Sequence, residues 1–244
     1  MSKVVTTTVL PDVAGGSVTL GGTGDSVVVT GNDIRTNALQ DTGGIAIFTS
    51  DGSGSITSLG FPGALNLIST STASSVANLS ITSGLNSTYD VYIFKLFNIH
   101  AVTTDDGVNL TFQTSTDGGS TYGVTATTTY FGADYNESGG NSHYLQYIGS
   151  GDLAQGTGYQ RLTQALGNVA DEGTSGQIYL FAPSSTTYIK NFYTRCQGYG
   201  FGNTADDMYA GGYFNTTSAI NAIDFKMTAG TFSGTIKLYG ISKS

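Results

Sequence analysis

Short hydrophobic runs alternate with glycine-containing turns along the leading part of the chain. Val- and Thr-rich runs separated by Gly15-Gly16, Gly21-Gly22 and Gly24-Asp25 predict strand, turn and strand. The runs are residues 3–9, 17–20, 26–30, 38–41, 45–48 and 55–57. Strands this short bury little apolar surface in a single chain, whereas three intertwined chains could share a core. We therefore expect a homotrimer in which residues 1–60 exchange contacts between chains.

Longer strand-like segments follow the turn at Phe61-Pro62-Gly63, so the boundary is expected near residue 62. Residues 89–99 carry apolar side chains on both alternating faces, which is typical of a central strand. Further strands are expected at 64–69, 76–81, 108–114, 124–131, 143–148, 176–182, 187–199, 208–215, 219–227 and 231–241. The spacing and the Gly-rich turns predict a jelly-roll-like antiparallel sandwich.

The expected core of this sandwich consists of apolar residues from three of these strands. They are Ile93, Phe94, Leu96, Phe97, Ile223, Phe225, Ile236 and Leu238. Residues 159–166 fit a helix, with Tyr159, Leu162 and Leu166 on one face, and fit a strand equally well. The fold class is all-β in either case: an N-terminal strand or stalk region, residues 1–62, followed by a β-sandwich head, residues 63–244.

Aromatic residues support this division of the chain. The sequence holds 15 Tyr and 12 Phe, yet only Phe48 and Phe61 precede Tyr89. Aromatic side chains supply much of the apolar area that a core buries. The leading region therefore resembles an adaptor, and the remainder can form a globular head.

Charge and hydropathy limit the partners. Nine basic residues against 17 acidic ones give a net charge of -8, and no basic cluster occurs, so we do not expect a nucleic acid partner. The longest apolar run, Val91 to Phe97, is interrupted by Lys95 and is too short to span a bilayer, so we expect no membrane insertion. The first residues lack the pattern of a secretory signal, so we expect the protein to be made in a cytosol.

Residue types that carry chemistry are few and scattered. Cys196 lies in a strand-like run and is expected to be a small buried residue rather than a nucleophile. His100 and His143 lie at strand ends without a second His or Cys beside them. We therefore expect no catalytic residue, no bound metal and no cofactor, and the chain is not expected to be an enzyme.

Paired acids in polar loops leave one alternative open. The pairs are Asp105-Asp106, Asp171-Glu172 and Asp206-Asp207. They could bind Ca²⁺ together with loop carbonyls, but we expect them to be solvated loop tips. Residues 51–55 place oxygen-bearing side chains at alternate positions but lack the later glutamate of a calcium loop.

Residues 115–122, Ser-Thr-Asp-Gly-Gly-Ser-Thr-Tyr, match an Asp-box pattern that resembles the one repeated in sialidases. In such a box the Asp and the hydroxyls hold a turn while the aromatic ring lies underneath. Here the pattern occurs once, and Arg35, Arg161 and Arg195 are too widely spread to suggest a carboxylate-binding cluster. The motif is expected to be structural and to close a β-hairpin.

Six tyrosines lie in or beside polar, Gly- and Asn-rich segments, a composition shared by recognition surfaces, by sugar sites and by the rim of an aromatic core. They are Tyr130, Tyr135, Tyr144, Tyr147, Tyr199 and Tyr209. The absence of Trp weakens the carbohydrate reading. Residues 132–141 and 198–207 are the expected receptor-contacting loops.

The C-terminal runs 211–227 and 233–241 resemble the C-terminal domain of virion structural and tail-fibre proteins of marine bacteriophages. Residues 181–187, 89–94 and 39–54 are similar to the same proteins. The resemblance covers most of the chain from about residue 36 and supplies no catalytic residue. It implies a noncatalytic virion protein.

The expected function is that of a trimeric tail-fibre or other appendage subunit. Residues 1–62 would attach to other virion proteins, and the head would contact a host-surface glycan or protein. Two alternatives stay open: a capsid decoration or head-fibre protein, and a carbohydrate-binding module. The sequence does not distinguish a tail from a head location.

Overall fold

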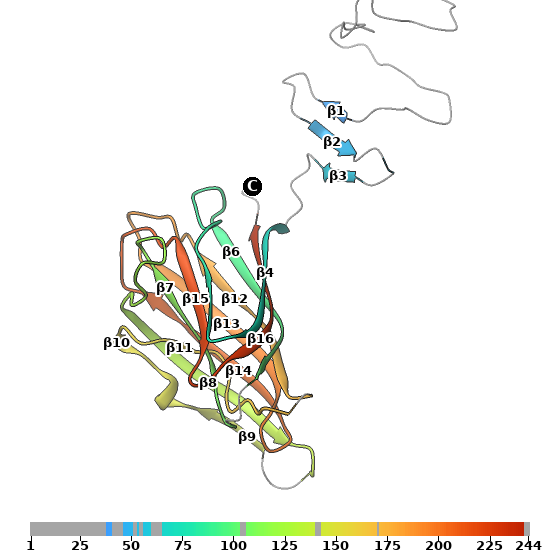
Figure 1. Ribbon diagram of the computed structural model, residues 1–244. Coiled ribbons are helices and arrows are strands. Elements are labelled where there is room, and N and C mark those ends of the chain that lie inside the picture. The colour runs from blue at the N-terminus through green and yellow to red at the C-terminus, as the bar shows by residue number, and fades with distance from the viewer. Residues whose placement is uncertain are drawn as a thin grey trace, which may run out of the picture. The chain divides into compact units, whose positions relative to one another are not determined.

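The computed structural model describes residues 38–40, 46–50, 53, 56–59, 65–102, 106–139, 143–169 and 171–241. It divides the chain into Met1–Phe61 and Pro62–Ser244. In the first part, β1 (Ala38–Gln40), β2 (Ala46–Ser50) and β3 (Ile56–Leu59) form an antiparallel sheet in that order (Figure 1). They match three of the predicted runs. The runs at 3–9, 17–20 and 26–30 lie outside the described residues.

The second part is an antiparallel β-sandwich, as predicted. Its large sheet has the order β10-β8-β14-β13-β12-β6-β16-β4, with β9 paired to β8, and its small sheet has the order β11-β7-β15-β5. The large-sheet strands are β4 (Leu65–Val76), β6 (Val91–Ala101), β8 (Ala126–Asn136), β9 (His143–Tyr147), β10 (Ala154–Gly156), β12 (Gly173–Phe181), β13 (Lys190–Gly200), β14 (Thr204–Phe214) and β16 (Phe232–Ile241). The small-sheet strands are β5 (Asn78–Ile81), β7 (Leu110–Ser115), β11 (Gln160–Arg161) and β15 (Ala222–Met227).

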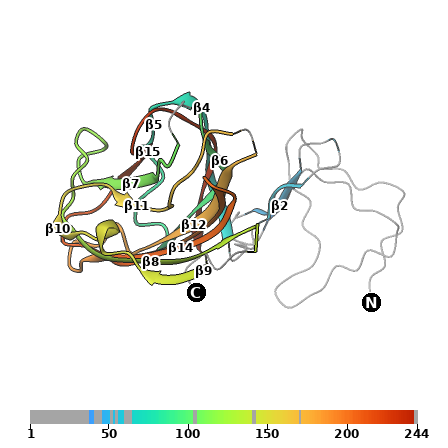
Figure 2. The ribbon, with the colours of Figure 1, turned by 90° about the horizontal axis from the view of Figure 1, so that it is seen from below.

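Figure 2 shows the large sheet curving around the small one, which covers its concave side. The core lies between the two layers because alternate strand residues point inward. Phe112 of the small sheet contacts Phe192 and Phe214 of the large sheet, with ring centroids 5.3 and 6.0 Å apart. Such edge-to-face contacts are favourable geometries for aromatic pairs.

Seven of the eight predicted core residues are buried, and Phe97 is the exception at 40% exposure. Ile93 is buried on the convex side, opposite Tyr179 and Tyr239 of the neighbouring strands. The prediction for Phe97 is wrong because Phe97 alternates with the inward-facing Phe94 and Leu96, so its side chain lies on the convex side, away from the small sheet.

The bulge in β6 lies at Phe97 and Asn98. Both neighbouring strands shift register there: Gly176 pairs with Leu96 but Thr174 pairs with Ile99, and Thr235 pairs with Phe97 but Ser233 pairs with His100. Asn98 adopts a φ of 49°, which Asn tolerates better than most residues. The extra residue leaves both Phe97 and Asn98 exposed and returns Ile99 to the core.

Gly234 on β16 makes room for this bulge. Its φ is 142°, and a Cβ atom there would lie 2.6 Å from Ile99 Cδ1 and 2.8 Å from the Asn98 carbonyl oxygen. A side chain at this position would therefore force the two strands apart. The Ser175 hydroxyl accepts a hydrogen bond from the Asn98 amide at 3.1 Å on the opposite side. The bulge is thus held from both neighbouring strands.

One open alternative is decided and one expectation is corrected. Residues 159–166 form only the short strand β11 and an irregular segment in which Leu162 and Leu166 are buried. Among the described residues the one helical element is the 3₁₀ turn η1 (Gly149–Gly151). The segments 132–141 and 198–207 are mainly strand rather than loop, because β8, β13 and β14 extend into them. No helix among the described residues is long and apolar enough to cross a membrane.

Candidate functional site

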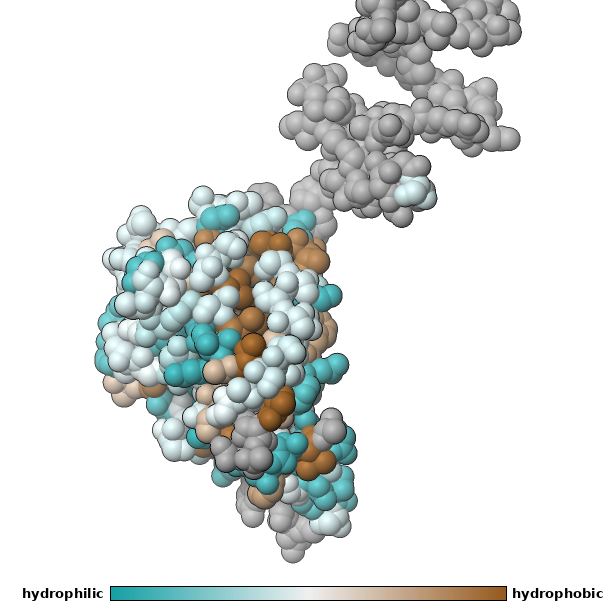
Figure 3. All heavy atoms as spheres, in the orientation of Figure 1, coloured by the Kyte–Doolittle hydropathy of each residue, from teal (hydrophilic) through white to brown (hydrophobic). Residues whose placement is uncertain are grey.

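The convex side of the large sheet, called here the outer face, carries the side chains that alternate with the core residues. On β13, the even-numbered residues from Lys190 to Cys196 are buried and the odd-numbered ones are exposed. Hydrophobic side chains reach the surface of the head, and Figure 3 shows a band of them between polar residues on one side of it. On the outer face, the large exposed ones include Leu67, Phe97, Phe131, Leu145, Tyr147 and Tyr193.

Two pairs of stacked rings organise the outer face. Tyr179 and Tyr193, directly opposite on β12 and β13, have ring centroids 4.6 Å apart and planes within 12° of parallel. Phe131 and Tyr209, opposite on β8 and β14, stack at 5.2 Å and 4°. Tyr193 is 45% exposed. Stacking on a sheet holds these rings in one orientation, so a ligand can contact them at little cost in side-chain entropy.

Arg195 joins the second ring pair to a charged group. Its guanidinium donates two hydrogen bonds to the Asp207 carboxylate, from Nε at 3.0 Å and from Nη2 at 2.8 Å, and lies 5.3 Å from the Tyr209 ring centroid. The Tyr209 hydroxyl donates to Asp207 at 3.0 Å. Hydrogen bonds from Arg195 lower the pKa of Asp207 and keep it ionised. The arrangement fixes all three side chains on the outer face.

Only some of the six predicted tyrosines belong to this face. Tyr135, Tyr147 and Tyr209 lie on it, and the Tyr199 hydroxyl at its end donates to Asn203 Oδ1 at 2.9 Å. Tyr130 is fully buried on the concave side beside Met208, and burial raises its pKa, so it is a core residue. The side chain of Tyr144 lies outside the described part of the chain.

A hollow of about 270 Å³ lies beside the β6 bulge on the outer face. Lys95 and Phe97 line it from β6, and the polar side chains of Ser175, Gln177 and Arg195 line it from the two strands beyond. An adjoining hollow of about 280 Å³ shares Ser175 and Gln197 with it, and its other lining residues are Asn98, His100, Asp171, Glu172, Gly173 and Thr174. Together the two linings contain two cationic side chains, two carboxylates, amides, hydroxyls and an aromatic ring.

The Asp box is a turn built on Asp117. Its carboxylate accepts hydrogen bonds from the hydroxyls of Ser115 and Thr121 at 2.6 and 2.7 Å and from the Thr121 amide at 2.9 Å. These bonds, led by the one from Ser115, lower the pKa of Asp117 to about 2. The prediction of a hairpin is wrong, because the turn follows β7 in the small sheet and leads to β8 in the large sheet.

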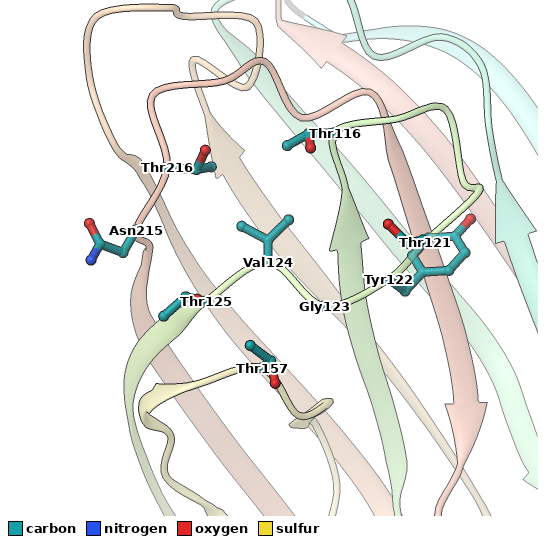
Figure 4. A pocket seen from close by; sticks show the side chains of 9 residues that line it. All are labelled: Thr116, Thr121, Tyr122, Gly123, Val124, Thr125, Thr157, Asn215 and Thr216. Carbon is teal, nitrogen blue, oxygen red and sulfur yellow. The ribbon is translucent and has the colours of Figure 1, made fainter.

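Beside the Asp box lies a larger hollow of about 520 Å³ (Figure 4). Figure 4 shows Val124 near its centre, with Thr116, Thr216 and Thr157 around it from three separate segments. Its lining carries hydroxyl groups and the amide of Asn215 but no charged side chain. Such a lining can bind through neutral hydrogen bonds and offers no acid or base for catalysis.

The acid pairs, histidines and cysteine are dispersed. Glu172 is buried and accepts a hydrogen bond from the Val169 amide at 2.9 Å, and Asp206 is buried within β14 rather than in a loop. Cys196 is buried, and burial raises the pKa of its thiol to about 12. No group of three or more His, Cys, Asp or Glu among the described residues could hold a metal ion. Asp105, the His143 side chain and residues 51–55 other than Ser53 lie outside them.

The sequence did not single out several residues of the outer face as candidate site residues. These are Tyr179, Tyr193, Lys95 and Lys237, which lie within runs that were interpreted only as strands. The alternation in residues 190–200, where large polar residues occupy every second position, was the available signal. Comparison with protein-family models, with curated proteins and with solved structures gave no match.

Proposed function

We propose that this chain is a noncatalytic structural subunit of a bacteriophage particle. It serves as a tail-fibre or other appendage subunit that attaches through residues 1–62 and presents residues 63–244 for host-surface recognition. The observation that carries the proposal is the outer face: stacked, partly exposed rings and a bidentate ion pair lie on strands of a large sheet. Rigid aromatic groups beside polar ones are typical of recognition surfaces.

The organisation of the chain supports an attached subunit rather than a free domain. Residues up to Phe61 separate from the head, and their described strands have only three to five residues each. Strands of this length gain stability when other chains complete them. The resemblance of residues 211–227 and 233–241 to phage virion proteins agrees with a trimeric particle component. A capsid decoration or head-fibre protein has the same architecture and differs in its place on the particle.

A carbohydrate-binding module is the second candidate function. The stacked pair Tyr179 and Tyr193 favours it, because an exposed ring held against a second ring offers a flat apolar surface to a sugar. A module of this kind needs no trimeric stalk. Light scattering on the full-length chain separates the two candidates.

Particle labelling tests the proposal. Antibodies raised against the full-length chain should label appendages of purified phage particles in electron micrographs. Label on the capsid surface would favour the decoration protein, and particles without label, from a lysate in which the chain is abundant, would overturn the proposal. Particles prepared without the gene provide the control.

A further inference from the structure

The hollow beside the β6 bulge lies within a row of cations. Across the sheet, Lys237, Lys95, Gln177 and Arg195 occupy directly opposed positions on β16, β6, β12 and β13. The chain has only nine Lys and Arg, and three of them are in this row. Because the net charge is -8, this concentration of positive charge on one sheet face differs from the rest of the molecule.

Lys95 and Lys237 have no carboxylate to neutralise them among the described residues. Each ammonium lies near an aromatic ring instead: Lys95 Nζ is 5.8 Å from the Tyr239 centroid, and Lys237 Nζ is 5.6 Å from the Phe97 centroid. Like charges directly opposite each other on a sheet destabilise it. Arg195, by contrast, is already paired with Asp207. An anionic group bound near both lysines would relieve their repulsion.

Beside these cations the hollow carries neutral polar groups. Gln177 and Gln197 line it, and Ser175 leads to the adjoining hollow with Asn98 and Asp171. Amide and carboxylate oxygens accept hydrogen bonds from hydroxyl groups. Phe97, two positions from Lys95 on β6, adds an exposed aromatic ring to the same lining. A matching ligand carries an acidic group, a partly apolar ring and hydroxyl groups close together.

We propose that this hollow binds an acidic glycan, a chain of sugar rings that carry carboxylate or sulfate groups. Lys95 and Lys237 contact the acidic group, the Phe97 ring contacts the face of a sugar, and the amides of Gln177 and Gln197 bind its hydroxyls. The inference deepens the proposed function, on which it rests for placing the glycan on a host surface. Binding by the isolated protein does not depend on that placement.

A second copy of the chain fits this region less well. Lysine is depleted at the cores of protein interfaces, and a two-fold contact through this face would bring four lysines together. Self-association through the outer face is therefore an outcome that the test must detect.

Titration calorimetry on the full-length protein tests the proposal with three probes of equal length: an oligogalacturonate, a sulfated galactan fragment and a neutral galactan fragment. The variants are Lys95→Gln and Lys237→Gln. Lys226→Gln is the matched control, since it removes one positive charge from the small sheet, where Lys226 Nζ lies 3.8 Å from the Tyr159 ring centroid. Thermal melting and light scattering verify the fold and the oligomeric state of every variant.

The proposal predicts that at least one acidic probe binds more tightly than the neutral one. Each outer-face lysine variant should weaken that binding by about tenfold, Lys226→Gln should leave it unchanged, and added salt should weaken it. The preferred probe identifies the acidic group as carboxylate or sulfate.

Three results would overturn the proposal: no binding of either acidic probe, equal binding of the neutral probe, or normal binding by folded Lys95→Gln and Lys237→Gln proteins. Loss of self-association in these variants would assign the face to contacts between copies and would also refute it. If the antibodies label phage particles but the isolated protein binds no acidic probe, this inference is refuted and the proposed function is not.

Discussion

Replacing two phenylalanines of β6 by alanine should have clearly different costs. The Phe94 side chain is fully buried, and its ring centroid lies 6.0 Å from that of Phe225 across the core. Phe94→Ala removes these contacts and leaves a cavity, so the free energy of unfolding should fall by about 3–5 kcal/mol. Phe97 lies three residues away on the same strand but faces outward.

The expected cost at Phe97 follows from its exposure. At 40% exposure about three fifths of its surface is buried, and full burial of such a side chain is worth about 1.5–3 kcal/mol. Phe97→Ala should therefore lower the free energy of unfolding by about 1–2 kcal/mol, without a cavity contribution.

Urea unfolding followed by circular dichroism measures both values, at equal protein concentration because an oligomer's stability depends on it. The slope of the unfolding free energy against urea concentration should be the same for both variants, so that a shift in midpoint reports a change in stability. A Phe97→Ala protein destabilised as much as Phe94→Ala would show that the ring lies in the core. The assignment of Phe97 to the outer face, and to the hollow that it lines, would then be wrong.

Three further predictions concern buried charges and assembly. Burial raises the pKa of Asp206 to about 6, so its stabilising contribution is complete below about pH 4 and is lost as the pH rises through the folded value. Asp206→Asn should therefore raise the melting temperature near pH 8 and not near pH 4. Equal shifts in melting temperature at the two pH values would contradict this prediction. The fully buried Lys190 ammonium donates hydrogen bonds to the carbonyl oxygens of Ser185, Tyr188 and Thr216 at 2.6, 2.9 and 3.1 Å. Lys190→Met should lower the free energy of unfolding by about 2–4 kcal/mol in urea titrations. An unchanged urea midpoint would refute a stabilising role for these hydrogen bonds. Light scattering of the full-length chain should give three times 25.2 kDa, and a monomeric mass would refute the trimer.

The sequence was sufficient for the fold because period-two alternation and Gly-rich turns repeat along the head. It placed Phe94, Phe225 and Leu238 in the core correctly. It failed at Phe97, because apolar residues at both alternating positions of residues 89–99 suggested two covered faces, whereas Phe97 lies exposed on the convex side. Asn98 and Gly234 mark the bulge that follows, but both residue types are common in this chain, and their meaning depends on which strands become neighbours.

The candidate site was harder to predict than the fold. Its residues come from β6, β12, β13 and β16, and only the strand order of the large sheet brings them into one row. Lys95 and Lys237 are 142 positions apart in the chain, and no local spacing reveals that they are opposed. The loop conformation expected for residues 132–141 and 198–207 was wrong for a related reason: Tyr- and Asn-rich composition does not distinguish long strands that end in a tight turn from loops.

Competition for adsorption tests the central claim most directly. Purified full-length protein, added in excess to susceptible cells before the phage that carries it, should occupy the receptor and slow adsorption. Lys95→Gln protein should compete less well than the natural protein, and Lys226→Gln protein should compete equally well. The account is contradicted if the phage particles carry the chain and saturating concentrations of the folded protein leave the rate of adsorption unchanged. Such a result would rule out a role in host recognition.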